Sequence, residues 1–133
     1  HAHEVSGSFA AMPADRDSLE YTVMSYRSYV GASTSTGYTN ASDSYPQSLM
    51  MYDIAAMQAL YGANYNTNAG NTVYTWSPTT GQMFVNGVGQ LMPVGNKIFL
   101  TIWDGGGIDT YDFSNYSTAV TVDLQPGKWS TAS

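Results

Sequence analysis

The sequence contains no cysteine, only two histidines and few charged side chains. The absence of cysteine excludes disulfide bridges, thiolate zinc sites and thiol catalysis. Charged residues make up 11% of the 133 residues, against about 25% in an average protein, and Ser, Thr, Asn, Gln and Gly supply the remaining polarity. With 43% hydrophobic residues, a chain of this length can bury a core without a metal or a disulfide. The composition favours a secreted, strand-rich protein.

Basic residues are scarce: four stand against ten acidic ones, and the net charge is -6. Because the basic residues do not cluster, we expect no surface for nucleic-acid phosphates and no nucleic-acid partner. Acidic surfaces favour divalent cations, although the same charge also keeps a protein soluble. No apolar run approaches the roughly 20 residues of a membrane span, and no signal-like segment opens the chain. We expect a monomer, and the abrupt start at "HAHEVSG" predicts a fragment of a longer protein.

The first half of the chain is predicted to be loop followed by one helix. Residues 1–47 show little periodicity and many Gly, Ser, Thr and Asn. The segment "SLMMYDIAAMQALY" at 48–61 has the apolar spacing of an amphipathic helix, with Ser48 as its cap and Gly62 as its stop. We expect its apolar side chains to pack in a core. They are Leu49, Met50, Ile54, Met57, Leu60 and Tyr61.

After Gly62 the pattern changes to period two or to short apolar runs, which predict β-strands separated by Gly, Asn and Pro turns. The predicted strands lie within 72–76, 82–88, 97–103, 110–113 and 119–124. Asn86-Gly87 is typical of a tight hairpin turn. The change near Asn64 predicts two parts, 1–64 and 65–133, and an α+β fold class.

Two short segments could bind a metal ion. His1 and His3 do not share a helical face, so two solvated histidines are an equal alternative to a metal site. If His1 is a free terminus, its amine, two amides and the His3 ring form a square-planar site for Cu(II) or Ni(II). Asp104 and Asp109 flank three glycines, an arrangement that either turns the chain or directs oxygens at calcium.

Several of these segments resemble one protease family. "VMSY" at 23–26, about twenty residues after His1, resembles the Met-turn of the metzincin zinc proteases, and specifically of the serralysin group. The helix "DIAAMQALYGAN" resembles the family's "DIAAIQ.LYGAN". "NTVYTW" and "IWDGGGIDTYDFSNY" resemble the opening of the family's carboxy-terminal calcium-binding β-roll. The resemblance runs from His1 to about Leu124.

The resemblance implies a zinc site. In the family, a helix with HExxHxxGxxH supplies three zinc histidines and a glutamate base. His1 would be the third of these histidines, with Ala2 where proline is usual. Met24 would lie beneath the metal, and Tyr26 would bind zinc at rest and stabilise the oxyanion during catalysis. Since HExxH is missing from this sequence, we do not expect the chain to be active alone.

The resemblance also implies a calcium site made from two segments. The first segment would offer main-chain carbonyls, and Asn68 stands where the family often has arginine. The second segment would add the glycine-rich turn with its two carboxylates. The implied ligands are Asn68, Gly70, Thr72, Asp104, Gly106, Gly107 and Asp109.

The resulting interpretation has two parts. Residues 1–64 would be the C-terminal part of a metzincin catalytic domain, made of loops, the Met-turn and a closing helix. Residues 65–133 would start an all-β, calcium-binding β-roll or sandwich region. The parent would be a secreted, extracellular metalloendopeptidase that uses Zn²⁺ and Ca²⁺ and hydrolyses internal peptide bonds of proteins. The alternative is a non-catalytic calcium-binding β module.

Because the HExxH helix packs on the 48–61 helix in the family, we also expect exposed apolar surface on the 48–61 helix.

Overall fold

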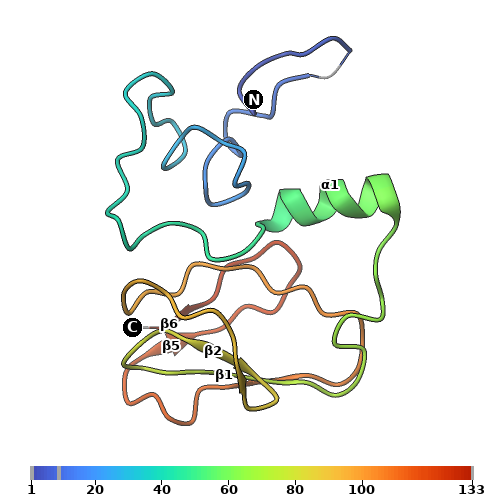
Figure 1. The fold of residues 1–133 in the computed structure, drawn as a ribbon, viewed down its shortest axis with the longest axis vertical. Helices are drawn as coiled ribbons and strands as arrows, with labels where there is room; N and C mark the ends of the chain where they lie inside the picture. Colours follow the sequence, from blue (N-terminus) through green and yellow to red (C-terminus); the bar gives the residue numbers. More distant parts are fainter. Residues whose placement is uncertain (1, 9, 133) are drawn as a thin grey trace. The chain divides into compact units, whose positions relative to one another are not determined.

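The computed structural model describes residues 2–8 and 10–132. Within these residues the chain forms one helix and six short strands (Figure 1). They are α1 (Met51–Tyr61), β1 (Val73–Trp76), β2 (Met83–Val85), β3 (Val88–Gly89), β4 (Thr110–Asp112), β5 (Val120–Thr121) and β6 (Thr131–Ala132).

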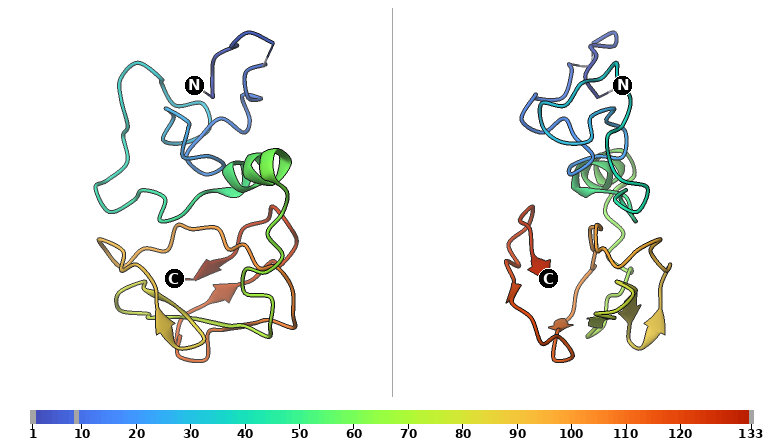
Figure 2. Two further views of the ribbon diagram at one scale, coloured as in Figure 1. Left: turned by 45° about the vertical axis from the view of Figure 1, so that its right-hand side comes forward. Right: turned by 90° about the vertical axis from the view of Figure 1, so that its left-hand side faces the viewer.

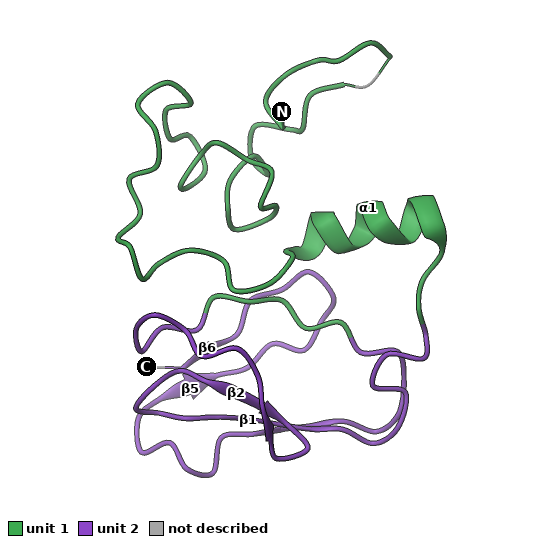
Figure 3. Cartoon of the chain, in the orientation of Figure 1, with its two compact units in different colours: residues 1–64, 99–103 green, residues 65–98, 104–133 purple. Residues whose placement is uncertain are grey.

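Contacts divide the chain into two compact units (Figure 3). The first unit contains residues 1–64 and 99–103, and the second contains residues 65–98 and 104–133. The break after Asn64 falls where the sequence pattern changes, but the 99–103 segment lies in the first unit although it follows the break. The identification of the two parts as protease domains stays a prediction.

Helix α1 begins three residues later than predicted. Met50, with extended backbone angles, is its N-cap residue, and its N–H donates to Asp53 Oδ2 at 2.9 Å. The prediction of Ser48 as the cap is wrong because the Ser48 hydroxyl accepts the Thr101 N–H instead, at 2.8 Å. The predicted stop is confirmed: Gly62 has φ of 83° and donates its N–H to Gln58 O, a conformation that glycine adopts without strain.

The apolar residues of the 48–61 segment are mostly exposed. Met50 is fully buried, whereas Leu60 is 73% exposed, and Leu49, Met57 and Tyr61 are also exposed. The prediction that they form a core is therefore wrong beyond Met50, and the prediction of exposed apolar surface is confirmed. The apolar pattern specifies a helix locally, but burial needs a packing partner, and the described residues of the first unit leave this face open.

The second unit contains a four-stranded sheet in the order β3-β2-β1-β4. Strand β1 pairs antiparallel with β2 and parallel with β4. The β2–β3 hairpin turns at Asn86 and Gly87, whose φ angles of 50° and 79° confirm the predicted tight turn. Asn86 also accepts the Val73 N–H on its side-chain oxygen at 2.8 Å, which ties the turn to β1.

Aromatic side chains fill the space over β1. Tyr74 and Trp76 are buried, and Trp76 stacks on Phe113 with ring centroids 4.7 Å apart. Tyr111 on β4 meets both Tyr74 and Trp76 edge-on. Large aromatic side chains of this kind contribute much of the buried apolar area of a small core.

Strands β5 and β6 form a separate antiparallel pair, visible as neighbouring arrows in Figure 2. The strands predicted within 72–76, 82–88, 110–113 and 119–124 are confirmed in shorter form. β6 was not predicted.

The strand predicted at 97–103 is wrong, because this segment has no strand conformation. It lies against the chain just before α1, where Gln47 N–H donates to Phe99 O at 2.8 Å. Residues 99–103 of this segment therefore belong to the first unit without joining a sheet. Among the described residues, no helix has the length and apolarity needed to cross a membrane.

Candidate functional site

The loop at 22–27 carries Met24 and Tyr26 outward on a buried base. Thr22 and Ser25 are buried, whereas Met24 is 65% and Tyr26 41% exposed. Thr22 Oγ1 accepts the Met24 N–H at 3.1 Å, and Ser25 Oγ accepts the Arg27 N–H at 3.0 Å. These side-chain-to-backbone bonds are typical of tight turns, so the loop presents the thioether and the phenol at its surface.

A buried carboxylate fixes the second part of this loop. Asp17, 2% exposed, accepts the Ser25 hydroxyl at 2.6 Å and Arg27 Nε at 2.8 Å. The Arg27 guanidinium also donates to Ala32 O. Tyr38 donates its hydroxyl to Ser25 O at 2.8 Å. A buried carboxylate with both oxygens bonded restrains its partners strongly, because water cannot replace them.

A second carboxylate joins the loop to helix α1. Asp53 accepts the Thr22 hydroxyl at 2.5 Å on one oxygen, and the N–H groups of Val23 and Met50 at 2.9 Å on the other. One side chain in the first helical turn thus bonds both the helix start and the loop that carries Met24. The roles of Asp17 and Asp53 were not predicted from the sequence. Asp17 stands among other charged residues in "DRDSLE" at 15–20, and Asp53 is an acidic residue in the first turn of a helix, so neither position is distinctive.

The described residues do not make up a catalytic zinc site, which takes three protein ligands. His1, the implied zinc histidine, lies outside the described residues. Of the described ones, no group of three or more His, Cys, Asp or Glu is placed to hold a metal. The His3 ring lies 5.3 Å from the Tyr26 ring, centroid to centroid. Tyr26 could contribute one donor to a zinc site. The roles implied for His1, Met24 and Tyr26, and the copper site on His1 and His3, stay predictions.

The two segments implied for calcium do meet in the second unit. Thr72 N–H donates to Asp109 Oδ1 at 2.9 Å, and Gly105 N–H donates to Thr67 O at 2.7 Å. Ile108 N–H donates to Asn71 Oδ1, also at 2.9 Å. The parallel pairing of β1 with β4 continues this contact into the sheet. The turn at 104–109 therefore lies directly against the segment at 67–72.

Two glycines make this close approach possible. A Cβ on Gly105 would overlap the main-chain oxygen of Tyr65 and lie 2.7 Å from that of Thr67. A Cβ on Gly107, whose φ is 120°, would overlap the oxygen of Gly70. Only glycine leaves room for the two backbones at these points.

The two segments bring several oxygen atoms close together. The Thr72 hydroxyl lies 3.2 Å from Asn68 O and 3.0 Å from Gly70 O, so the two carbonyls converge. Asp109 is bonded to the same segment. Carbonyl and carboxylate oxygens in a flexible loop are the donors that Ca²⁺ prefers. The Thr72 carbonyl accepts the Thr110 N–H at 2.8 Å, so the sheet already uses one of its lone pairs. The assignment of all seven residues as calcium ligands stays a prediction.

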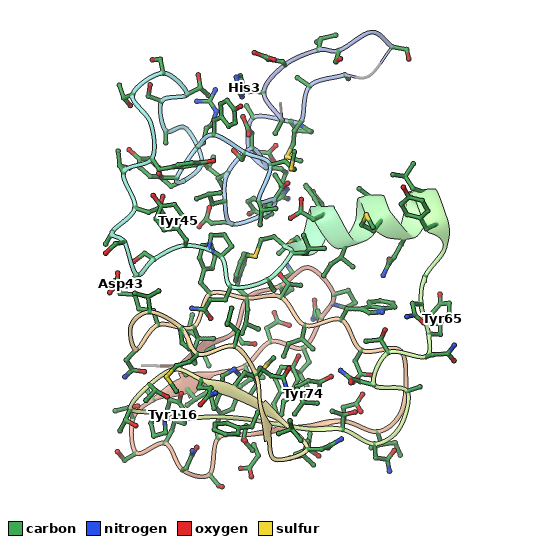
Figure 4. The ribbon with its side chains drawn as sticks, in the orientation of Figure 1. His3, Asp43, Tyr45, Tyr65, Tyr74 and Tyr116 are labelled. Carbon is green, nitrogen blue, oxygen red and sulfur yellow. The ribbon has the colours of Figure 1, made fainter. Side chains whose placement is uncertain are left out.

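Tyr74 is buried inside the second unit (Figure 4). Its hydroxyl donates to Asp104 Oδ2 at 2.6 Å and accepts from Asn68 Nδ2 at 3.0 Å. Burial, followed by the hydrogen bond to Asp104, raises the pKa of Tyr74 well above its ordinary value, so the phenol keeps its proton. Burial also raises the pKa of Tyr111, which Asp104 and Asp109 raise further. Sequence analysis placed Tyr74 on a strand, but nothing in the pattern marked its hydroxyl.

Comparisons with known proteins show which family the chain resembles. Residues 63–132 match the family described as Peptidase M10 serralysin C terminal. The chain is 35% identical over 116 residues to metallopeptidase AprA of Pseudomonas marginalis, covering 86% of this chain and 23% of that protein. It is 36% identical over 116 residues to serralysin of Proteus mirabilis, covering 86% and 21%. It is 32% identical over 130 residues to serralysin C of Dickeya chrysanthemi, covering 98% and 25%.

The matched family defines the class of protein: a C-terminal region of M10 metallopeptidases, which is rich in β-strands in this chain. The chain belongs to the serralysin C-terminal family of these peptidases, and the predicted serralysin resemblance is confirmed. It spans between a fifth and a quarter of the length of these relatives.

Proposed function

We propose that this chain is part of a secreted, zinc-dependent metalloendopeptidase that hydrolyses internal peptide bonds of proteins. Residues 1–64 would form the end of its catalytic domain, and residues 65–133 would begin a calcium-binding β-roll region. One observation carries the proposal. The alignments with metallopeptidase AprA and serralysin cover 116 residues, which is longer than the 63–132 stretch and so includes residues of the loop and helix part.

In this proposal the loop at 22–27 contributes to the active site. Its buried attachment to Asp17 and Asp53 would hold the exposed Tyr26 hydroxyl at a fixed place. From there the phenol would donate a hydrogen bond to the oxygen of the peptide carbonyl as negative charge develops on it. Met24 would form an apolar surface beside the metal. His1 would be one zinc ligand, and residues outside this chain would supply the others. Zinc, when bound, supplies Lewis-acid chemistry.

The second unit would bind calcium between its two adjoining turns. The ligands would be the seven oxygen-bearing positions named above, from Asn68 to Asp109. Extracellular calcium, at millimolar concentration, saturates sites of the weak affinity typical of extracellular modules. Calcium would therefore order this region after export, in agreement with a secreted location.

The test compares Tyr26→Phe with Tyr29→Phe in the complete protease that contains this chain. Tyr29 is a matched control, since it is exposed and lies three residues away. Loss of one oxyanion donor lowers kcat by about 10²- to 10³-fold, and we expect this for Tyr26→Phe with little change in KM. Tyr29→Phe should leave both constants unchanged. Equal activity of the two variants would contradict the role of Tyr26.

A second candidate function is a calcium-binding module without catalysis. It is favoured by the hydrogen bonds that join the two turns of the second unit. If the complete protein, loaded with zinc and calcium, failed to cleave an unfolded protein substrate, this candidate would replace the protease.

A further inference from the structure

Tyr74 has a buried, hydrogen-bonded side chain next to the segments 67–72 and 104–109, which are proposed to bind calcium and are called here the two calcium turns. It lies on β1, which is paired on both sides, with Val85 of β2 opposite it on one side and Tyr111 of β4 on the other. Tyr74 is 1% exposed, and its ring meets the Tyr111 ring edge-on, with the ring centroids 5.5 Å apart. Because backbone and ring are both fixed, the sheet determines where the hydroxyl lies.

That hydroxyl bonds one residue from each calcium turn. Asp104 comes from the glycine-rich turn and accepts the phenol proton at 2.6 Å. Asn68 comes from the first segment and donates its amide to the phenol oxygen at 3.0 Å. The phenol therefore uses its donor on one turn and its acceptor on the other. A phenylalanine would fill the same space without either bond.

Each of these bonds restrains a group implied as a calcium ligand. Asp104 Oδ1 accepts the Gly106 N–H at 2.9 Å, so the bond from Tyr74 to Oδ2 leaves the carboxylate with both oxygens oriented. Asn68 has a φ of 50°, a left-handed conformation that costs energy in a residue with a side chain. The bond from its amide to Tyr74 helps to hold that conformation and so directs the Asn68 carbonyl.

We propose that Tyr74 is a positioning residue of the calcium site, which sets the geometry of both turns before the ion binds. The inference rests on the calcium site of the proposed function. Without the hydroxyl, the ion itself would have to order Asp104 and Asn68, and that ordering cost would appear as weaker binding. Partners outside the ligand shell commonly change metal affinity in this way.

The test is calorimetric titration of the 133-residue chain with CaCl₂ after chelation and dialysis. We compare wild type, Tyr74→Phe and Tyr111→Phe. Tyr111 is a matched control: it is a partly buried tyrosine in the same aromatic group, and no bond of its hydroxyl to a calcium turn occurs among the described residues. Since partners outside the ligand shell contribute about 10- to 100-fold in metal affinity, Tyr74→Phe should raise the calcium Kd about tenfold or more, and Tyr111→Phe should not.

A second readout separates positioning from simple packing. The melting temperature is measured in excess chelator and in excess calcium. A packing role would lower both temperatures equally, whereas a positioning role reduces the increase that calcium produces. Asn68→Gly serves if Tyr74→Phe does not fold, because glycine keeps the main-chain carbonyl and the left-handed backbone while losing the bond to Tyr74.

The outcomes are distinct. Weaker calcium binding by Tyr74→Phe, with Tyr111→Phe like wild type, supports the inference. Wild-type affinity in Tyr74→Phe overturns it and leaves the calcium site standing. If Tyr74→Phe does not fold, the same two outcomes are read from Asn68→Gly. No calcium binding by wild type overturns the calcium site itself, and the inference with it.

Discussion

Removal of the buried Asp17 carboxylate should destabilise the first unit strongly. In Asp17→Ala, the buried Ser25 hydroxyl loses its acceptor at 2.6 Å and the Arg27 guanidinium loses its partner at 2.8 Å. Breaking a buried ion pair from one side costs about 3–5 kcal/mol. Because the Arg27 side chain is 27% exposed, water can take up part of its charge, and we expect a loss of about 2–4 kcal/mol in the free energy of unfolding.

Asp15→Ala is the matched control. The Asp15 side chain is 72% exposed and lies 3.8 Å from the Arg16 guanidinium, so both substitutions remove one carboxylate that faces an arginine. An exposed pair contributes at most about 1 kcal/mol, and we expect a smaller loss than that. Asp17→Asn should fall between the two alanine variants, because its side-chain oxygen can still accept the Ser25 hydroxyl.

The assay is urea unfolding followed by far-ultraviolet circular dichroism, with all variants measured in the same buffer and at the same calcium concentration. Helix α1 lies in the first unit, so the helical signal reports on the unit that carries Asp17. Equal free energies of unfolding for Asp17→Ala and Asp15→Ala would refute the reasoning, since burial would then make no difference to the contribution of the pair.

Three further predictions concern packing and turns. Gly105→Ala should lower the free energy of unfolding by about 1–3 kcal/mol, because the new Cβ overlaps main-chain oxygens. Gly70→Ala, whose Cβ would meet open space, should lower it by less than about 0.5 kcal/mol. Equal melting temperatures for the two variants would contradict this prediction. In urea unfolding, Leu60→Ala should lower the free energy of unfolding by less than about 0.5 kcal/mol, and Met50→Ala should lower it by about 2–5 kcal/mol. A large loss for Leu60→Ala would mean that other residues cover this face of the helix. Asn86→Ala should lower the free energy of unfolding by about 1 kcal/mol, because alanine lacks the side-chain hydrogen bond to Val73 and tolerates positive φ less well. An unchanged melting temperature would mean that Asn86 does not restrain the turn.

Features set by neighbouring residues could be predicted from the sequence. The Gly62 stop of the helix and the hairpin at Asn86-Gly87 depend on backbone conformations that few residues adopt. Strands β1 and β2 follow from alternation over a few positions. These predictions depend on no distant segment, and the structure confirms them.

Features that depend on distant partners could not be predicted in the same way. The segment at 97–103 has the apolar run of a strand, but hydrogen bonds to residues before α1 decide its structure. The helical stripe predicted a core, and whether Leu60 is buried depends on what packs against it. The bonds of Asp53 to the 22–23 loop cross 30 residues or more, and no local pattern encodes them.

The same difference between local and distant features applies to the candidate sites. The resemblance correctly identified the family, and the two turns around Asn68 and Asp109 do meet. The hydrogen bonds of the Tyr74 hydroxyl could not be predicted, because a tyrosine on an alternating strand has the pattern of an ordinary core residue. The role proposed for Tyr74 depends on where its hydroxyl lies, and only the three-dimensional arrangement shows that position.

The most direct test of the calcium assignment is a titration of the 133-residue chain with CaCl₂, for wild type, Asp109→Ala and Asp112→Ala. Asp112 is the control, since its carboxylate bonds the nearby Ser114 N–H and is outside the proposed ligand set. We predict that wild type and Asp112→Ala bind at least one calcium per chain and that Asp109→Ala binds one fewer. Identical titrations for Asp109→Ala and wild type would contradict the assignment of calcium to these two turns.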